Sequence, residues 1–272
     1  MNRNQLGAAA AALVLVATPG SGSAQHYRKG IQLHVSTRWE ECAFQLDPAL
    51  TQDAWRQFTE EAALVAYIRP LTDARPLGAG RVEVSLLQWA TAIDDADAAW
   101  NDTFVHPHEE HWLMEGDRLA FPGVMVRVGV SDRMDLGGYV TKNLKSNYGF
   151  VGGLIQHNII DDQKRGWAGA GRMSFVSLFG PEDVELTVLG LDVLASKTLP
   201  VNDWLTVSPY VGGSSYLSFS QEKSDVVELD GEIRPGNQAM IGAVAEVFRT
   251  RFAVEVSSAQ VQTLSFKVGV GL

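Results

Sequence analysis

The sequence is poor in cysteine and in long apolar runs, and both shortages limit what the protein can be. Cys42 is the only cysteine, so no disulfide can form within the chain. A lipid-anchor cysteine would directly follow a signal cleavage site, whereas Gln25 holds that place here. After residue 24, no apolar run approaches the about 20 residues that a membrane-spanning helix needs. If this chain enters a membrane, it does so as strands.

Positive charge is also scarce. Lys and Arg number 22 against 32 Asp and Glu, for a net charge of −10. Loss of a signal peptide whose one charge is Arg3 gives −10 − 1 = −11. A nucleic-acid-binding surface needs clustered basic residues, so we expect no nucleic acid partner. The sequence also lacks the GxSxG elbow of serine esterases, and we expect no cofactor.

Residues 1–24 have the pattern of a secretory signal peptide. Arg3 precedes a 12-residue apolar run, Leu6 to Ala17, and small residues up to Ala24 provide a cleavage site. The alternative is a buried helix. The mature chain would have about 250 residues, enough for one all-β domain.

The last twelve residues, Val261 to Leu272, alternate strictly between apolar and polar or small side chains. The apolar positions are Leu264, Phe266, Val268, Val270 and Leu272. A period of two is typical of a strand with one apolar face. Because an unpaired edge strand at a terminus promotes aggregation, we expect it to pair with the first strand of a closed barrel.

Ten strand-like runs follow residue 80, and most reach the 9–11 residues that a tilted strand needs to cross a bilayer. They are 80–93, 121–131, 133–142, 147–160, 166–177, 184–197, 203–219, 238–248, 251–258 and 261–272. Short links (131–133, 161–165, 198–202, 249–250) alternate with a set that includes the long 94–120 and 220–237. Short turns on one side and longer loops on the other are typical of outer-membrane barrels.

Residues 25–79 predict an N-terminal segment with one helix, on the periplasmic side or packed at the barrel mouth. Asp47-Pro48 is a good helix start, and helical spacing predicts a helix over roughly 48–62. A linker rich in Pro and Gly follows, up to Gly80. If Gly30–Ser36 and Leu64–Arg69 instead pair as a hairpin, the barrel has twelve strands.

The signal, the alternating strands of 80–272 and the terminal strand together make the chain similar to bacterial outer-membrane β-barrel proteins. In that family the last strand is an insertion signal, usually ending in an aromatic residue; Leu272 takes that place here. The resemblance implies a closed antiparallel up-and-down transmembrane β-barrel of about 10 strands. It also implies a Gram-negative outer membrane, contact with its lipid, and recognition of Val261–Leu272 by the barrel-assembly machinery.

Alternation alone does not say which face points inward. A soluble ligand-binding barrel buries its apolar row inside, whereas a membrane barrel turns that row outward. With the apolar row outward, Trp167, Phe252, Phe175 and Phe219 form a partial aromatic girdle. The inward row then holds five positive and five negative residues: Arg81, Glu83, Arg127, Asp135, Arg172, Asp192, Glu246, Arg251, Glu255 and Lys267. On a lipid face each Arg or Lys at mid-depth would cost about 2–4 kcal/mol, whereas opposite charges inside a narrow barrel can pair. We therefore expect a plugged or very narrow lumen.

The loop 94–120 carries the densest group of candidate ligands. His106, His108, Glu109 and His111 could bind a metal ion or a surface ligand, although their spacing matches no closed metal motif. A solvated surface loop is the alternative. Some ten-stranded outer-membrane barrels are proteases that use Asp and His at the rim, a role open to Asp94, Asp95 and Asp97 with His106 and His111.

Three functions remain open at this point. The first is a non-enzymatic outer-membrane barrel with a structural, adhesive or narrow-transport role and a charge-filled, porin-like or plugged lumen. The second is a hydrolase active at the outer rim. The third is a secreted soluble barrel that binds an apolar ligand.

Overall fold

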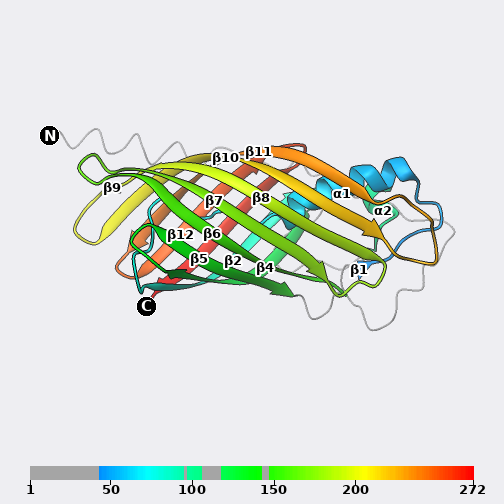
Figure 1. The fold of residues 1–272 in the computed structure, drawn as a ribbon, viewed down its shortest axis with the longest axis horizontal. Coiled ribbons are helices and arrows are strands. Elements are labelled where there is room, and N and C mark those ends of the chain that lie inside the picture. The colour runs from blue at the N-terminus through cyan, green and yellow to red at the C-terminus, as the bar shows by residue number, and fades with distance from the viewer. Residues whose placement is uncertain (1–42, 95–96, 106–117, 143–146) are drawn as a thin grey trace, which may run out of the picture. The chain divides into compact units, whose positions relative to one another are not determined.

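The computed structural model describes residues 43–94, 97–105, 118–142 and 147–272. Ten antiparallel strands close into a barrel (Figure 1). They are β2 (Val82–Ala92), β4 (Arg118–Gly129), β5 (Met134–Lys142), β6 (Gly149–Asp162), β7 (Trp167–Phe179), β8 (Val184–Lys197), β10 (Leu205–Glu222), β11 (Glu232–Val247), β12 (Thr250–Ser258) and β13 (Gln262–Gly271). Closure comes from β13, which pairs with β2 from Thr263↔Thr91 to Gly271↔Glu83. The prediction that the terminal strand pairs with the first is confirmed.

The strand boundaries differ most at β11, which begins at Glu232 and not at residue 238. Its pairing with β10 continues to Ser220↔Glu232, because two long strands can keep adding ladder bonds where side-chain alternation is weak. The loop between them is correspondingly shorter than predicted. The alternative of twelve strands is wrong, because Leu64–Ala66 belong to a helix and the next three residues form no strand.

The two ends of the barrel differ. One end, here called the short-turn end, carries tight links such as Phe248–Arg249 and the turn after β6. The short strand β9 (Leu199–Pro200) pairs with β10 there. The other, the long-loop end, carries the described residues between β2 and β4, with the short helix α2 (Ala98–Asn101) and strand β3 (Phe104–Val105). This is the asymmetry that the sequence predicts.

The helix of the N-terminal segment, α1 (Gln52–Ala66), lies later in the chain than predicted. Asp47 does not cap it: its carboxylate accepts a hydrogen bond from the Ala49 amide at 2.7 Å and forms a separate turn. Thr51 is the N-cap, and its hydroxyl accepts from the Ala54 amide at 3.3 Å. Before the helix, β1 (Ala43–Phe44) pairs with β3 at the long-loop end.

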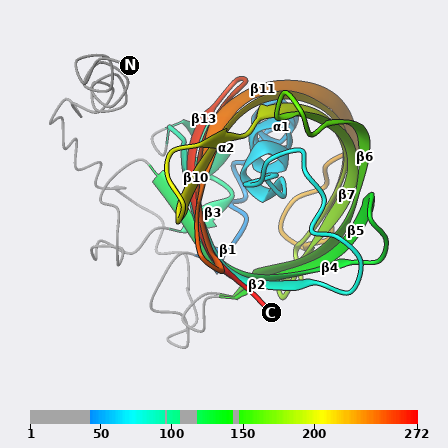
Figure 2. The ribbon, with the colours of Figure 1, turned by 90° about the vertical axis from the view of Figure 1, so that its left-hand side faces the viewer.

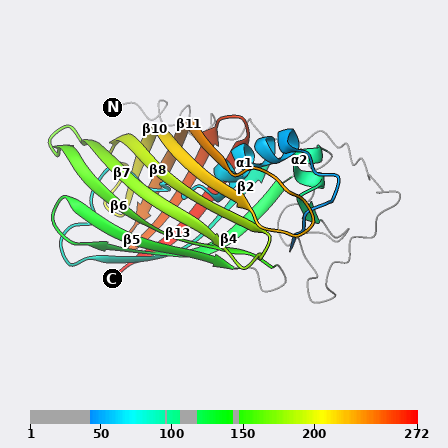
Figure 3. The same ribbon diagram turned by 45° about the vertical axis from the view of Figure 1, so that its right-hand side comes forward.

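Helix α1 lies within the ring of strands, as the view along the barrel shows (Figure 2). Its N-terminal end is at the long-loop end, where Gln52 bonds to Glu232 at the start of β11 (Figure 3). The following residues, Tyr67–Leu77, here called the lumen segment, cross the barrel to the short-turn end. There the Gly80 amide donates to the Gly129 carbonyl oxygen at 2.8 Å. Helix α1 and the lumen segment, two described parts of the stretch expected on the periplasmic side or at the barrel mouth, therefore lie in the interior.

The outer face of the barrel is apolar. Phe266 and Val268 are 45% and 46% exposed, whereas Lys267 between them is 2% exposed. The aromatic residues expected at the outer face, Trp167, Phe252, Phe175 and Phe219, are all exposed. None of the described helices is long and apolar enough to cross a bilayer. An apolar outside and a charged inside are the reverse of a soluble barrel, so the fold is that of a membrane-spanning β-barrel and the soluble alternative fails.

Candidate functional site

The barrel lumen gathers the ionisable side chains that alternate with the apolar outer row. Eight of the ten charges expected there are buried: Glu83, Arg127, Asp135, Arg172, Asp192, Arg251, Glu255 and Lys267. The other two lie at the short-turn end, where Glu246 is partly exposed and Arg81, one residue before β2, is exposed. The lumen wall therefore carries buried charges on most of its strands, and its charged residues become exposed at the short-turn end.

The wall charges are paired across neighbouring strands. The ion pairs with both partners almost fully buried are Lys267–Glu83 at 2.7 Å, Arg127–Asp135 at 2.6 Å, and Arg172–Asp192. Removing one partner of such a pair leaves an uncompensated buried charge, at a cost of about 3–5 kcal/mol. Each pair therefore fixes two adjacent strands and the orientation of the side chains that face the lumen.

The lumen segment fills the space between these walls and adds charges of its own. Arg69 and Asp73 are buried, and Arg75 is partly exposed at the short-turn end. The sequence analysis missed these residues, because the Pro- and Gly-containing stretch around them has the composition of a solvated linker. The one signal available was the density of polar side chains. Residues 67–75 contain one Tyr, two Arg and one Asp, which could serve as partners for charges inside a barrel.

The first half of the lumen segment is bound by β7, β8 and β13. The Tyr67 hydroxyl donates to Asp192 Oδ1 at 2.6 Å, and Arg172 donates to the Ile68 carbonyl oxygen at 2.9 Å. Arg69 donates to Thr263 Oγ1 at 2.7 Å and to the Leu64 carbonyl oxygen at 2.6 Å. Arg69 thereby binds both the end of α1 and the barrel wall.

The second half is bound by residues of β4, β5, β8 and β12. The Leu71 amide donates to Glu255 at 3.2 Å, and Arg127 donates to Thr72 Oγ1 at 2.7 Å. The Ala74 amide donates to Ser196 Oγ at 3.1 Å, and the Leu77 amide to Asp135 at 3.1 Å. Three of these groups, the amides of Leu71, Ala74 and Leu77, belong to the backbone of a segment with no secondary structure. Wall side chains therefore replace the ladder bonds that a strand would provide.

Asp73 is the most connected residue of the segment. Its carboxylate accepts from Arg251 at 3.0 Å and from Arg75 at 2.6 Å. Arg251 also lies 3.3 Å from Glu83, which in turn pairs with Lys267. This chain of charges joins the lumen segment to β2, β12 and β13 near the short-turn end.

Helix α1 occupies the long-loop end of the lumen. Trp55 is fully buried, and its indole N–H donates to the Asp230 carbonyl oxygen at 3.2 Å. Phe58 stacks on Trp55 with ring centroids 5.5 Å apart and meets Trp100 of α2 edge-on at 5.0 Å. This apolar cluster fixes the helix, and with it the entry of the lumen segment.

The predicted ligand cluster His106, His108, Glu109 and His111 lies outside the described residues. Of the acidic residues proposed with it for a rim protease, Asp94 and Asp97 are described, and Asp97 caps α2 by accepting from the Ala99 amide at 2.9 Å. Within 43–94, 97–105, 118–142 and 147–272, no group of three or more His, Cys, Asp or Glu is placed to hold a metal ion.

No protein-family model matches the sequence, and no curated protein matches it. Several solved bacterial barrels are similar to it at low identity. An outer membrane channel from Pseudomonas putida F1 is 11% identical over 76% of this chain and 100% of that chain, with a TM-score of 0.42. The β domain of the Bordetella autotransporter BrkA is 10% identical over 71% and 98%, with a TM-score of 0.40. LpxR from Salmonella typhimurium is 8% identical over 70% and 99%, with a TM-score of 0.33. Similarity at this level concerns the fold alone, and no activity of these proteins can be transferred to this chain.

Proposed function

We propose that this protein is a non-enzymatic outer-membrane β-barrel whose lumen is plugged, which favours a structural or adhesive role over narrow transport. The observation that carries the proposal is the lumen segment, which crosses the interior and is bound by side chains of the wall. Its partners come from β4, β5, β7, β8, β12 and β13. A segment held from so many sides leaves a diffusing solute no continuous path.

The energetics favour a resident plug over one that leaves readily. Withdrawing the segment would separate Asp73 from Arg251 and Tyr67 from Asp192 in the same movement. Hydrogen bonds to charged groups contribute about 1.5–3 kcal/mol each, and the segment makes several. Opening the lumen would therefore require the loss of many interactions together.

Planar-bilayer recording of the purified, folded chain tests this proposal. We expect no large and stable conductance from the wild type. Replacing the lumen segment, residues 67–77, by a Gly/Ser sequence of equal length should produce a steady conductance. The milder Asp73→Ala removes the acceptor for Arg75 and Arg251 and should give intermittent openings. Heat-modifiable migration on gels checks that each variant has folded.

Two controls keep the result specific. Asp53→Ala removes a carboxylate of α1 whose side chain is 92% exposed, and it should leave the barrel closed. Ala74→Cys with Ser196→Cys, in a Cys42→Ser background with Asp73→Ala, should close the openings on oxidation and restore them on reduction. A large, stable wild-type conductance would show that the proposal is wrong, as would a folded Gly/Ser variant that stays silent.

A further inference from the structure

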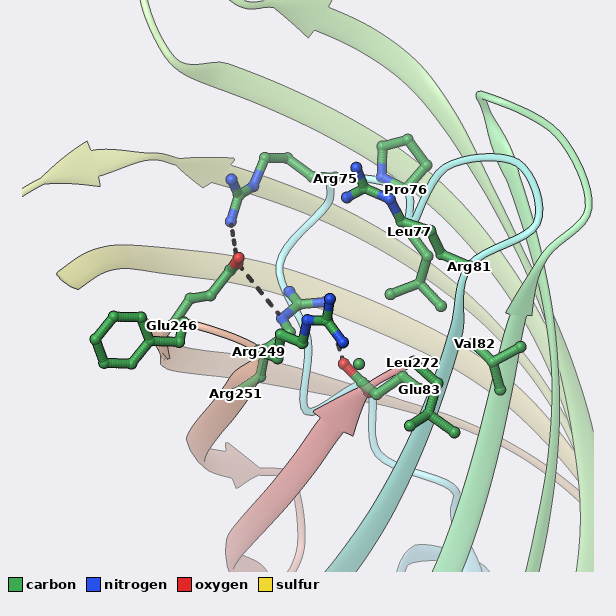
Figure 4. Close-up of a pocket in the computed structure, with 12 residues that line it drawn as sticks. Arg75, Pro76, Leu77, Arg81, Val82, Glu83, Glu246, Arg249, Arg251 and Leu272 are labelled. Atoms are coloured by element: carbon green, nitrogen blue, oxygen red, sulfur yellow. Dashed lines mark hydrogen bonds and ion pairs between the residues drawn. The ribbon is translucent and has the colours of Figure 1, made fainter. Parts of the chain in front are cut away.

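A cavity of about 430 Å³ opens at the short-turn end, where the lumen segment leaves the barrel (Figure 4). Four arginines line it: Arg75 of the lumen segment, Arg81 before β2, Arg249 in the β11–β12 turn and Arg251 on β12. The volume is within the range of small-molecule sites in proteins. Arg75 and Arg251 belong to the charge network that holds the lumen segment, whereas the contacts of that segment and the wall pairs described above do not include Arg81 or Arg249.

The carboxylates at the cavity are already engaged. Glu83 pairs with Lys267 and Arg251, and Glu246 lies 3.6 Å from Arg75 and 3.9 Å from Arg251. Figure 4 shows the contacts of Glu246 with Arg75 and Arg251, and of Arg251 with Glu83. Arg81 and Arg249 are exposed. Neither makes an ion pair with any residue in the described part of the chain. Two guanidinium groups therefore remain for an anion from outside.

The backbone holds these two arginines on either side of the end of β13. The Gly271 amide donates to the Arg249 carbonyl oxygen at 2.8 Å, and the Leu272 amide donates to the Val82 carbonyl oxygen at 2.8 Å. Arg249 and Arg81 are thus about two strand spacings apart, or about 10 Å. Two long side chains can converge over that distance on one phosphate group, which guanidinium groups bind by paired N–H···O bonds.

One edge of the cavity is apolar and faces away from the protein. Phe248 is 79% exposed and Leu272 is 74% exposed. Phe248 has a φ of +55°, a conformation that costs a bulky residue about 1–3 kcal/mol. Glycine would relieve that strain, so an exposed aromatic ring held there suggests a contact outside the chain. Aromatic side chains at the rim of a membrane barrel lie at the level of the lipid headgroups.

We propose that this cavity binds the phosphate of an anionic phospholipid from the leaflet at the short-turn end. Arg81 and Arg249 contact the phosphate, and Phe248 and Leu272 contact the glycerol and the first acyl carbons. A free phosphate ion has the same charged group as the lipid headgroup, but it has no apolar part that could contact Phe248 and Leu272. The proposal does not depend on whether the lumen conducts.

Native mass spectrometry of the full chain, folded in detergent, tests the site. The probes are dioctanoyl-phosphatidylglycerol, dioctanoyl-phosphatidylcholine and inorganic phosphate. We expect the wild type to retain phosphatidylglycerol at least ten-fold better than phosphatidylcholine. Arg81→Gln with Arg249→Gln should abolish that preference. The matched pair Arg133→Gln with Arg165→Gln removes the same charge from two other short turns and should preserve it.

Phe248→Gly separates the two possible sources of phosphate. Glycine suits the backbone of that turn, so the variant should fold. It should weaken retention of phosphatidylglycerol several-fold and leave the binding of inorganic phosphate unchanged. Unaltered lipid retention in this variant would show that the site recognises the phosphate group alone and that the proposed contact of Phe248 with the lipid is wrong. If the Arg81/Arg249 and Arg133/Arg165 double variants retain phosphatidylglycerol equally well, the proposed site is wrong. If the double variant does not fold, Arg249→Gln alone should reduce the preference, and an unchanged preference would overturn the site as well.

Discussion

Glu83→Gln is the sharpest perturbation of the charged lumen. Glu83 is completely buried on β2. Its carboxylate accepts from Lys267 at 2.7 Å, from Arg251 at 3.3 Å and from the Ser85 hydroxyl at 3.1 Å. Glutamine keeps the shape of the side chain and one acceptor oxygen but removes the charge. The substitution therefore tests the electrostatic contribution with little change in packing.

The expected loss of stability depends on which carboxylate partners Arg251 and Lys267 retain in the variant. Arg251 retains Asp73 at 3.0 Å. Lys267, 2% exposed, has no other carboxylate within ion-pair distance in the part of the chain that the structure describes. A buried charge that loses its partner costs about 3–5 kcal/mol. Because one of the two cations stays paired, we expect the free energy of unfolding to fall by about 3 kcal/mol.

Urea unfolding in detergent micelles, followed by tryptophan fluorescence, measures this loss. The matched control is Glu83→Gln with Lys267→Met, which removes the stranded ammonium together with the carboxylate. Replacing a buried ion pair by uncharged side chains of similar volume is often neutral or stabilising. We therefore expect the double variant to recover most of the stability that the single variant loses.

A loss below about 1 kcal/mol for Glu83→Gln would contradict the reasoning, because values of that size are typical of solvated ion pairs. The lumen around Glu83 would then be open to bulk water. A double variant no more stable than the single one would locate the loss in packing or in Ser85, and not in the uncompensated Lys267.

Three further predictions concern packing, topology and pH. Gly242→Ala should destabilise the barrel by about 1–3 kcal/mol in the same urea assay, because its Cβ would lie 2.4 Å from Tyr210 Cζ and 2.6 Å from the Val254 carbonyl oxygen. Gly138→Ala, with nothing within 4 Å, should cost less than 1 kcal/mol. In a Cys42→Ser background, Asp53→Cys should react with an impermeant maleimide on intact cells, and Lys164→Cys only after the outer membrane is permeabilised. Equal labelling of both would contradict the topology. Burial, with Glu182, Glu222 and Asp225 nearby, raises the pKa of Asp183; the stability gained from its protonated form is present at acid pH and lost as pH rises through that pKa. Asp183→Asn should therefore raise the unfolding midpoint at pH 7 more than at pH 4, and an equal change at both would argue against it.

Much of the barrel was predictable from the sequence because it depends on local pattern. Alternation with a period of two decides which side chains share a face, so Phe266 and Lys267 could be assigned to opposite faces before any pairing was known. Loop lengths predicted the two unlike ends. The boundary of β11 was not predictable, because it depends on continued pairing with β10 and not on its own alternation.

The lumen segment was decided by the tertiary structure alone. Tyr67, Arg69 and Leu71 have no helical or strand period to predict their place, and their partners Asp192, Thr263 and Glu255 are 125 to 194 residues away in the sequence. From the sequence alone it follows that apolar and charged side chains occupy opposite faces of the strands, because neighbouring residues on a strand must face opposite sides. Which of the two faces lines the interior was decided by the tertiary structure. Only closure of the sheet brought distant wall charges around one stretch of unpaired backbone. Because buried amides and carbonyls need partners, that closure decided what fills the lumen.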